Sequence, residues 1–341
     1  MIFEEKQLVK EKMKRESVIK RILGNSSAIK KTREQIKIIA SCDASVLITG
    51  ESGSGKELAA HAIHYLSDRS SFPFIPINCG AIPENLFENE LFGHIKGAFT
   101  NAYENQEGLV KEAQNGTLFL DEIGVINPYI QVKLLRLLQD KEFKPLGDPR
   151  VKKADIRIIA ASNRELPRLV EDGSFREDLF FRLNIVSLHI PPLRERKGDI
   201  PELIDYFLNK YCMEYHKPPK NISERVLKVM LDYSWPGNIR ELENKIQHLI
   251  VMTEGNEITY NDLPDFSQQS LSPIQRITEI ESFKKAKQKN IDEFERSYLT
   301  LLMQEYKGDV VNAARKAGKS RTALWNLLSK HRLHPRTFQD D

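Results

Sequence analysis

Short apolar runs separated by longer amphipathic or loop segments fill the first 190 residues of this 341-residue chain. These runs predict β-strands at residues 46–49, 74–78, 117–120, 156–161 and 184–190. Apolar residues at helical spacing within 22–40 predict a helix that leads into the first strand. This alternation predicts an α/β fold, in which a mostly parallel sheet is covered by helices on both faces.

The pattern changes after Pro191 and Pro192, where helical periodicity continues without strands. Three helices are predicted, at 200–215, 224–233 and 238–252, and they indicate a smaller helical subdomain. A polar stretch interrupted by prolines then predicts a linker, and helical periodicity returns at about residue 291. The expected segments are an arm (1–20), an α/β subdomain (21–190), a helical subdomain (191–262), a linker (263–290) and an all-α C-terminal domain (291–341).

The composition is that of a globular protein, with 40% hydrophobic and 29% charged residues. No apolar run is long enough to span a membrane, and the N-terminus has no secretory signal pattern. The three cysteines are far apart, as expected of reduced cytosolic thiols, so we expect a cytoplasmic protein without a membrane partner. Net charge is only +3, but residues 284–336 carry thirteen Lys/Arg against five Asp/Glu, which predicts a basic C-terminal module.

A glycine-rich loop follows the first predicted strand and precedes a helix. Glycines at 50, 53 and 55 let backbone N–H groups converge on an anion, and the lysine and the helix dipole add positive charge. The spacing is that of a phosphate-binding P-loop, except that a glutamate replaces the usual Ser or Thr after the lysine. The residues of the predicted loop are Gly50, Glu51, Ser52, Gly53, Ser54, Gly55, Lys56 and Glu57.

Polar residues at the ends of two other strands could complete a nucleotide site. Asp121 would hold Mg²⁺ and Glu122 would polarise the attacking water; the alternative is that both acids cap the next helix. Asn163 could reach a γ-phosphate or serve only as a turn residue. The chain lacks the guanine-specifying Asn-Lys-x-Asp pattern, which favours ATP over GTP.

Two arginines six residues apart, Arg176 and Arg182, lie among acids and aromatics. They could form ordinary salt bridges, or act as arginine fingers on the ATP of a neighbouring subunit.

Six motifs in order, at 50–57, 90–100, 121–122, 175–182, 191–196 and 235–242, resemble the AAA+ core of sigma-54-dependent transcriptional activators. The resemblance covers about residues 21–265. It implies a P-loop AAA+ domain with a helical lid, bound ATP and Mg²⁺, and a ring, usually a hexamer, with active sites between subunits.

The resemblance also assigns roles to single residues. Lys56 matches the P-loop lysine, and Glu57 is what this family has at that position. Asp121 and Glu122 match the Mg²⁺-binding and water-activating acids, and Asn78 matches the residue that restrains the catalytic glutamate. The remaining matches are Asn163 to the first sensor, Arg240 to the second sensor, and Arg176 and Arg182 to the trans-acting arginines.

One loop departs from the family. The family grips sigma-54 with Gly-Ala-Phe-Thr-Gly-Ala, and this chain has Asn101 in place of the second glycine. Asparagine tolerates positive φ better than other non-glycine residues, so the turn is expected to persist. Phe99 and Thr100, the expected sigma-54 contacts, are retained; alternatively, Phe99 only packs into a hairpin.

The C-terminal domain resembles the Fis-type helix-turn-helix of these activators. A small-residue helix at 310–317 ends at Gly318, and Ser320 caps a second helix at 321–330. A plain helical hairpin would explain the apolar spacing but not the basic excess, so we predict binding to double-stranded DNA at upstream sites. Candidate DNA contacts are Lys319, Arg321, Thr322, Trp325, Asn326, Lys330 and Arg332.

The resemblance predicts a ring ATPase that remodels the sigma-54 RNA polymerase holoenzyme from closed to open complexes. The alternative, favoured by Asn101, is a DNA-binding AAA+ regulator that uses ATP only for assembly. Only about twenty residues precede the core, so we expect control by a separate inhibitor, by expression level or by a domain outside this sequence.

Overall fold

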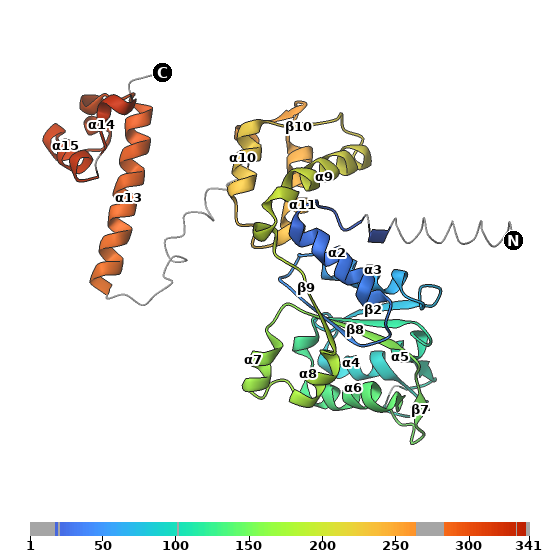
Figure 1. The fold of residues 1–341 in the computed structure, drawn as a ribbon. Helices are drawn as coiled ribbons and strands as arrows, with labels where there is room; N and C mark the ends of the chain where they lie inside the picture. The colour runs from blue at the N-terminus through green and yellow to red at the C-terminus, as the bar shows by residue number, and fades with distance from the viewer. Residues whose placement is uncertain (1–17, 20, 101, 264–282, 332, 339–341) are drawn as a thin grey trace. The chain divides into compact units, whose positions relative to one another are not determined.

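The computed structural model describes residues 18–19, 21–100, 102–263, 283–331 and 333–338. The chain divides into two compact units at Pro264 (Figure 1). Several predictions lie outside the described residues: most of the N-terminal arm, Asn101, residues 264–282 of the linker, and Arg332.

The first unit contains the predicted parallel sheet. Its strands are β1 (Val46–Thr49), β2 (Phe74–Asn78), β5 (Thr117–Asp121), β8 (Arg157–Ser162) and β9 (Val186–His189), in the order β2-β5-β8-β1-β9 and all parallel. The main helices are α2 (Ser27–Ala40), α3 (Lys56–Leu66), α4 (Glu84–Phe92), α6 (Pro128–Asp140), α7 (Leu166–Glu171) and α8 (Glu177–Leu183). The predicted α/β fold class is therefore confirmed.

Alternation along the strands separates two cores, one on each face of the sheet. Ile48 and Ile159 pack with α2 and α3, whereas their neighbours Leu47 and Ile158 pack with α4, α6, α7 and α8. Figure 1 shows the sheet between these two helical layers. Because the strands are parallel, their carboxyl ends share one edge, where ligands of such sheets bind.

Two short hairpins extend the α/β subdomain. One pairs β3 (Gly93–His94) with β4 (Gln106–Glu107), and the other pairs β6 (Glu142–Phe143) with β7 (Lys152–Lys153).

The helical subdomain consists of α9 (Ile200–Glu214), α10 (Glu224–Asp232) and α11 (Asn238–Met252). The prediction of no strands between these helices was wrong, because β10 (Asn221–Ile222) pairs with β11 (Glu257–Ile258). Two-residue strands leave no periodic signal in the sequence. Trp235 is fully buried here and donates to Met230 O at 2.8 Å.

The second unit contains α13 (Phe283–Glu305), α14 (Val310–Lys316), α15 (Arg321–Lys330) and the short η6 (Pro335–Phe338). The linker prediction was wrong for residues 283–290, where lysine, alanine and glutamine favour the helix that the structure shows. On α13, the buried face is narrow. Leu299, Leu302 and Met303 form the core with α14 and α15, while Phe294 and Leu301 are 69% and 67% exposed.

No helix among the described residues is long and apolar enough to cross a membrane.

Candidate functional site

The glycine-rich loop joins β1 to α3 at the carboxyl edge of the sheet. Gly53 and Gly55 have φ of +72° and +106°, and a Cβ on Gly53 would lie 2.3 Å from Gly237 O. Glycine is therefore required at 53 both by conformation and by the close approach of the helical subdomain. Helix α3 begins in this loop, at Lys56. The unpaired N–H groups of its first turn therefore face the space that an anion would fill.

The Lys56 ammonium lies within this loop. The Lys56 residue is only 7% exposed, and its ammonium donates to Gly50 O at 2.9 Å and Glu51 O at 3.0 Å. Burial lowers the pKa of Lys56, while the charges of Asp121 and Glu122 oppose that shift. The lysine and the two predicted acidic residues are thus electrostatically coupled.

Asn78 and Asp121 end the neighbouring strands β2 and β5, where they pair, and Glu122 directly follows β5. The Asn78 Oδ1 atom accepts from Gly80 N at 2.8 Å, and a Cβ on Gly80 would lie 2.5 Å from Glu122 Oε2 and 3.4 Å from Asn78 Oδ1. The Asn78 amide and the Glu122 carboxylate therefore converge on Gly80. This proximity is consistent with the predicted restraint of Glu122 by Asn78.

Cys79 lies beside these groups but is unsuited to nucleophilic chemistry. It is buried, and burial together with the Asp121 and Glu122 charges raises the pKa of its thiol to about 12. The thiol therefore stays protonated.

Asn163 is exposed and directly follows β8. Because β8 lies between β5 and β1, Asn163 occupies the carboxyl edge between the acidic residues and the glycine-rich loop. This is the position expected of a γ-phosphate sensor.

The helical subdomain contacts the glycine-rich loop directly. Arg194 donates to both Glu51 carboxylate oxygens, at 2.8 and 2.6 Å, which lowers the pKa of Glu51. Asn238 Nδ2 donates to Glu51 Oε2 and Ser52 O, both at 3.1 Å. Arg240 Nη1, the predicted second sensor, donates to Ser52 Oγ at 3.2 Å. Arg240 was predicted from the sequence, whereas Arg194 and Asn238 were not, although they lie in the motifs at 191–196 and 235–242.

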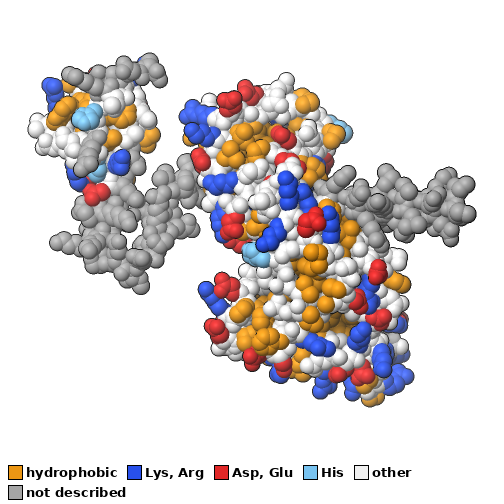
Figure 2. All heavy atoms as spheres, viewed as in Figure 1, with side chains coloured by type: hydrophobic (Ala, Val, Ile, Leu, Met, Phe, Trp, Pro, Cys, Tyr) orange, Lys and Arg blue, Asp and Glu red, His pale blue; other side chains and the backbone are white. Residues whose placement is uncertain are grey.

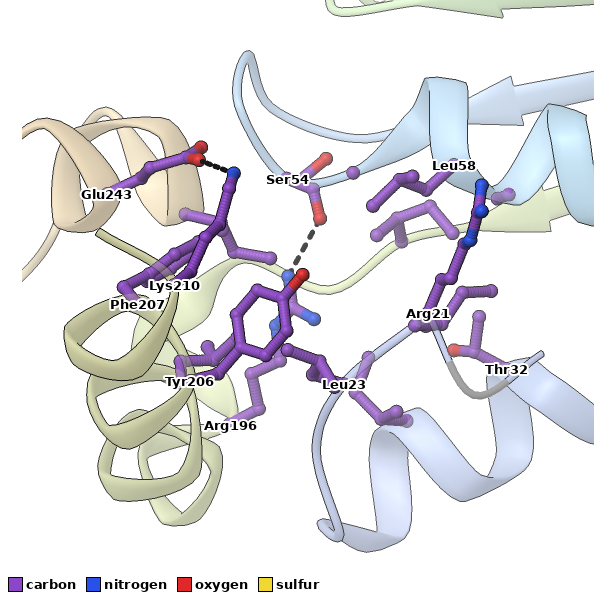
Figure 3. A pocket seen from close by; sticks show the side chains of 17 residues that line it. Arg21, Leu23, Thr32, Ser54, Leu58, Arg196, Tyr206, Phe207, Lys210 and Glu243 are labelled. Atoms are coloured by element: carbon purple, nitrogen blue, oxygen red, sulfur yellow. Dashed lines mark hydrogen bonds and ion pairs between the residues drawn. The ribbon is translucent and has the colours of Figure 1, made fainter. Parts of the chain in front are cut away.

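A cavity of about 450 Å³ lies between the glycine-rich loop and the helical subdomain (Figure 3). Its walls are mainly apolar, and Ser54 and Gly55 border it, so a flat ring placed there would be joined to a phosphate chain on the loop. Sequence reasoning missed this pocket, because its lining comes from widely separated residues: Ile22, Leu23, Ile29, Leu58, Ile190 and Phe207.

Two buried charged residues of the turn before α9 shape the cavity. Arg196, which is 2% exposed, donates to Ser54 O at 2.8 Å. The fully buried Asp199 carboxylate accepts from Asn25 N, Ser26 N and Ser26 Oγ, each at 2.7 Å. Asp199 thereby fixes the chain segment that carries Ile22 and Leu23 into the cavity wall.

The two predicted arginine fingers lie at opposite ends of α8. Arg176 precedes the helix and forms a bidentate pair with Asp178, at 3.0 and 2.7 Å, which raises the pKa of Arg176. Arg182 is exposed and forms no ion pair with any residue that the structure describes. Within the described chain, neither arginine bonds to the glycine-rich loop, Asp121 or Glu122.

The Phe99 loop, residues 95–105, lies between β3 and β4. Gly97 N donates to Ala102 O at 2.8 Å and Ala102 N donates to Phe99 O at 3.0 Å, so the loop turns tightly. The Phe99 ring lies 4.9 Å from the His94 ring but remains 46% exposed, and Thr100 is also exposed. Phe99 is thus only partly packed into the hairpin, and its outer face is available to a partner.

In the second unit, α15 presents the predicted DNA-contacting face. Ser320 caps the helix, accepting from Ala323 N at 3.2 Å, and the side chains of Lys319, Arg321, Thr322, Trp325 and Asn326 are exposed. Lys330 differs, because its ammonium pairs with Asp292 and Glu295 of α13 at 2.6 and 2.7 Å. A phosphate would have to compete with two carboxylates for Lys330.

The chain is similar to two known domain families and to several transcriptional regulators. The family described as the Sigma-54 interaction domain matches residues 22–189, and the AAA+ ATPase lid domain matches residues 194–280. The transcriptional regulatory protein GlrR of Escherichia coli K12 is 45% identical over 320 residues, covering 94% of this chain and 70% of that protein. Regulatory protein AtoC of the same strain is 43% identical over 314 residues, covering 92% and 68%.

The fold is also similar to that of a solved structure. NtrX from Brucella abortus in complex with ATP has a TM-score of 0.70 and 32% identity, covering 97% of this chain and 74% of that chain.

Proposed function

This chain belongs to the family of sigma-54-dependent transcriptional regulators, and we propose that it is a ring-forming ATPase that opens promoters bound by sigma-54 RNA polymerase. The observation that carries the proposal is the convergence of Lys56, Asp121, Glu122 and Asn78 beside one phosphate-binding loop. The Phe99 loop belongs to the same α/β subdomain as this site. The proposed ATPase site and the proposed sigma-54 contact therefore lie in one subdomain. The alternative, an ATP-binding regulator that no longer activates sigma-54, is not favoured by the match to the Sigma-54 interaction domain.

In the proposed reaction, the phosphates of ATP lie on the P-loop and its base enters the cavity bordered by Ser54 and Gly55. Glu122 orients the attacking water, and Asn78 limits the positions that Glu122 can take. Asp121 is the carboxylate placed to hold Mg²⁺, which would supply charge neutralisation at the phosphates. Arg176 and Arg182 act on the ATP of a neighbouring subunit, most simply in a hexameric ring.

The test uses sigma-54 holoenzyme on a promoter with the protein bound upstream. We expect the promoter to open, with unpaired bases, in the presence of ATP but not with a non-hydrolysable analogue. Equal opening with both nucleotides would exclude a hydrolysis-driven mechanism. Control by a separate inhibitor stays a prediction.

We predict that Asp199→Asn raises the KM for ATP about tenfold, because charge-assisted hydrogen bonds contribute roughly 1.5–3 kcal/mol each and asparagine weakens those to Asn25 and Ser26. The rate at saturating ATP should change little, since Asp199 lies outside the acidic pair. Steady-state phosphate release measures both parameters. Glu202→Gln is the control, because within the described chain the only hydrogen-bond partner of the Glu202 carboxylate is the exposed Asn25 side chain, at 2.8 Å. If Asp199→Asn lowers the melting temperature but leaves the KM for ATP unchanged, Asp199 only stabilises the fold and the prediction is wrong.

We also predict that Arg321→Ala lowers the preference for cognate over random duplex about tenfold or more, because one base contact contributes roughly 1–3 kcal/mol of discrimination. Fluorescence anisotropy with both duplexes at fixed salt measures this ratio. Lys316→Ala on α14 is the control: its exposed cation should affect both duplexes equally. Equal binding of the two duplexes by wild type would refute sequence-specific recognition.

A further inference from the structure

The β6–β7 hairpin has an excess of positive charge. Residues 141–153 contain five Lys/Arg and two Asp/Glu, a net charge of +3 in thirteen residues, equal to that of the whole chain. In Figure 2, Lys and Arg side chains gather at the lower right of the first unit, where Figure 1 places β7. We call residues 141–153 the basic hairpin.

Most of these cations face solvent, whereas one of the two acids does not. The Lys141, Arg150 and Lys152 side chains are 62%, 79% and 42% exposed. Lys144 and Lys153 are exposed and form no ion pair with any other residue in the described part of the chain. The Asp148 side chain is 1% exposed and accepts from Arg150, so it orders the turn. The outer surface therefore carries mainly one sign of charge.

The basic hairpin is hydrogen-bonded to the base of the Phe99 loop. Leu146 N donates to Gly93 O at 2.8 Å, and Ile95 N donates to Leu146 O at 3.1 Å. Gly147, with φ of +75°, lies so close to Ala98 that a Cβ there would lie 2.8 Å from the Ala98 Cβ. These bonds and contacts make the two loops one structural unit, so a partner that reaches Phe99 also comes near the cations.

We propose that the basic hairpin binds the phosphate backbone of promoter DNA beside the sigma factor that the Phe99 loop engages. This inference rests on the proposed function, because the target of Phe99 would itself be bound to DNA. Cations spread along a hairpin suit a line of phosphates, and such contacts need no base sequence. Within the described chain, Lys144 and Lys153 form no ion pair, whereas Lys141 and Lys152 lie 3.7 and 3.8 Å from Asp155 and Asp148. The contact is distinct from that predicted for α15, which belongs to the other unit.

The first test replaces two cations without disturbing the Asp148–Arg150 pair. In Lys144→Gln/Lys153→Gln, the slope of log open-complex yield against log salt should fall by about two, as expected for two lost phosphate contacts. ATP hydrolysis and binding to the upstream site should remain at wild-type levels. The control is Lys30→Gln/Lys31→Gln, which removes two exposed lysines from α2 on the other face of the sheet.

The second test identifies the partner directly. Val151 is 49% exposed between Arg150 and Lys152, so a photo-reactive benzoylphenylalanine at this position samples whatever the basic hairpin touches. With the full chain, ATP and the promoter–holoenzyme complex, we expect crosslinks to promoter DNA. The same label at Ile38, 71% exposed on α2, should give none.

The outcomes separate the two proposals. If wild type opens the promoter but Val151 crosslinks only to protein, or the double variant keeps the wild-type salt slope, the DNA contact is refuted and the proposed function stands. If wild type opens no promoter under any salt condition, the proposed function fails and the inference fails with it.

Discussion

Phe99→Ala is expected to abolish ATP-dependent promoter opening while ATP hydrolysis stays within about twofold of wild type, since surface substitutions usually change stability by no more than ~0.5 kcal/mol. The Phe99 side chain is 46% exposed and its recorded ring contact is with His94, outside the nucleotide site. Its removal therefore takes away contact surface and leaves Lys56, Asp121 and Glu122 in place. Permanganate reactivity of promoter bases and phosphate release, measured on the same preparation, report the two activities separately.

Phe72→Ala is the matched control for that variant. Phe72 is 45% exposed, nearly as much as Phe99, but it lies in the segment before β2, at the amino edge of the sheet. The Phe72→Ala variant should therefore open promoters as wild type does. Normal promoter opening by Phe99→Ala would contradict the assignment of the loop as the sigma-54 contact.

The second prediction concerns mixed rings. Glu122→Gln and Arg182→Ala should each lose ATPase activity about 100-fold or more, and mixing the two should restore part of it, since an arginine finger contributes roughly 10³–10⁵ in rate. The physical reason is that Arg182 is exposed on α8 and has no bond to its own Asp121 or Glu122 within the described chain. In a mixed ring, some interfaces combine an intact Glu122 with an intact arginine from the neighbour.

Phosphate release at several mixing ratios measures this recovery. Arg168→Ala is the control, because Arg168 is 76% exposed on α7 and forms a surface pair with Glu165, so its loss should leave activity unchanged. Mixtures that form rings but never exceed the activity of the single variants would place Arg182 in the active site of its own subunit. The same experiment with Arg176→Ala tests whether its pair with Asp178 can open to release the arginine.

Local pattern was sufficient for the elements that carry the site. Strand β2 and helix α11 have the predicted bounds, 74–78 and 238–252. The glycine-rich loop lies between β1 and α3, as its composition predicts. The relation of Asn78 to Glu122 came from the family resemblance and could not be obtained from spacing. It depends on β2 and β5 being neighbours in the sheet, which is a property of topology.

Contacts between distant segments were the ones that sequence reasoning missed. Glu51 and Arg194 are 143 residues apart, and Asp199 reaches Ser26 across 173 residues. Neither pairing has a periodic or compositional signal, because each depends on how the helical subdomain packs on the sheet. On α13, two apolar stripes overlap, and only packing decides that Leu299 and Met303 face inward while Phe294 and Leu301 do not.

The central claim is that ATP hydrolysis at Glu122 drives promoter opening through the Phe99 loop. The most direct measurement compares wild type with Glu122→Gln for open-complex formation by sigma-54 holoenzyme on a promoter with the protein already bound upstream. Wild type should open the promoter in the presence of ATP, and Glu122→Gln, although it binds ATP and forms rings, should not. Open complexes formed equally by both proteins, or by neither while wild type hydrolyses ATP within rings, would contradict the account.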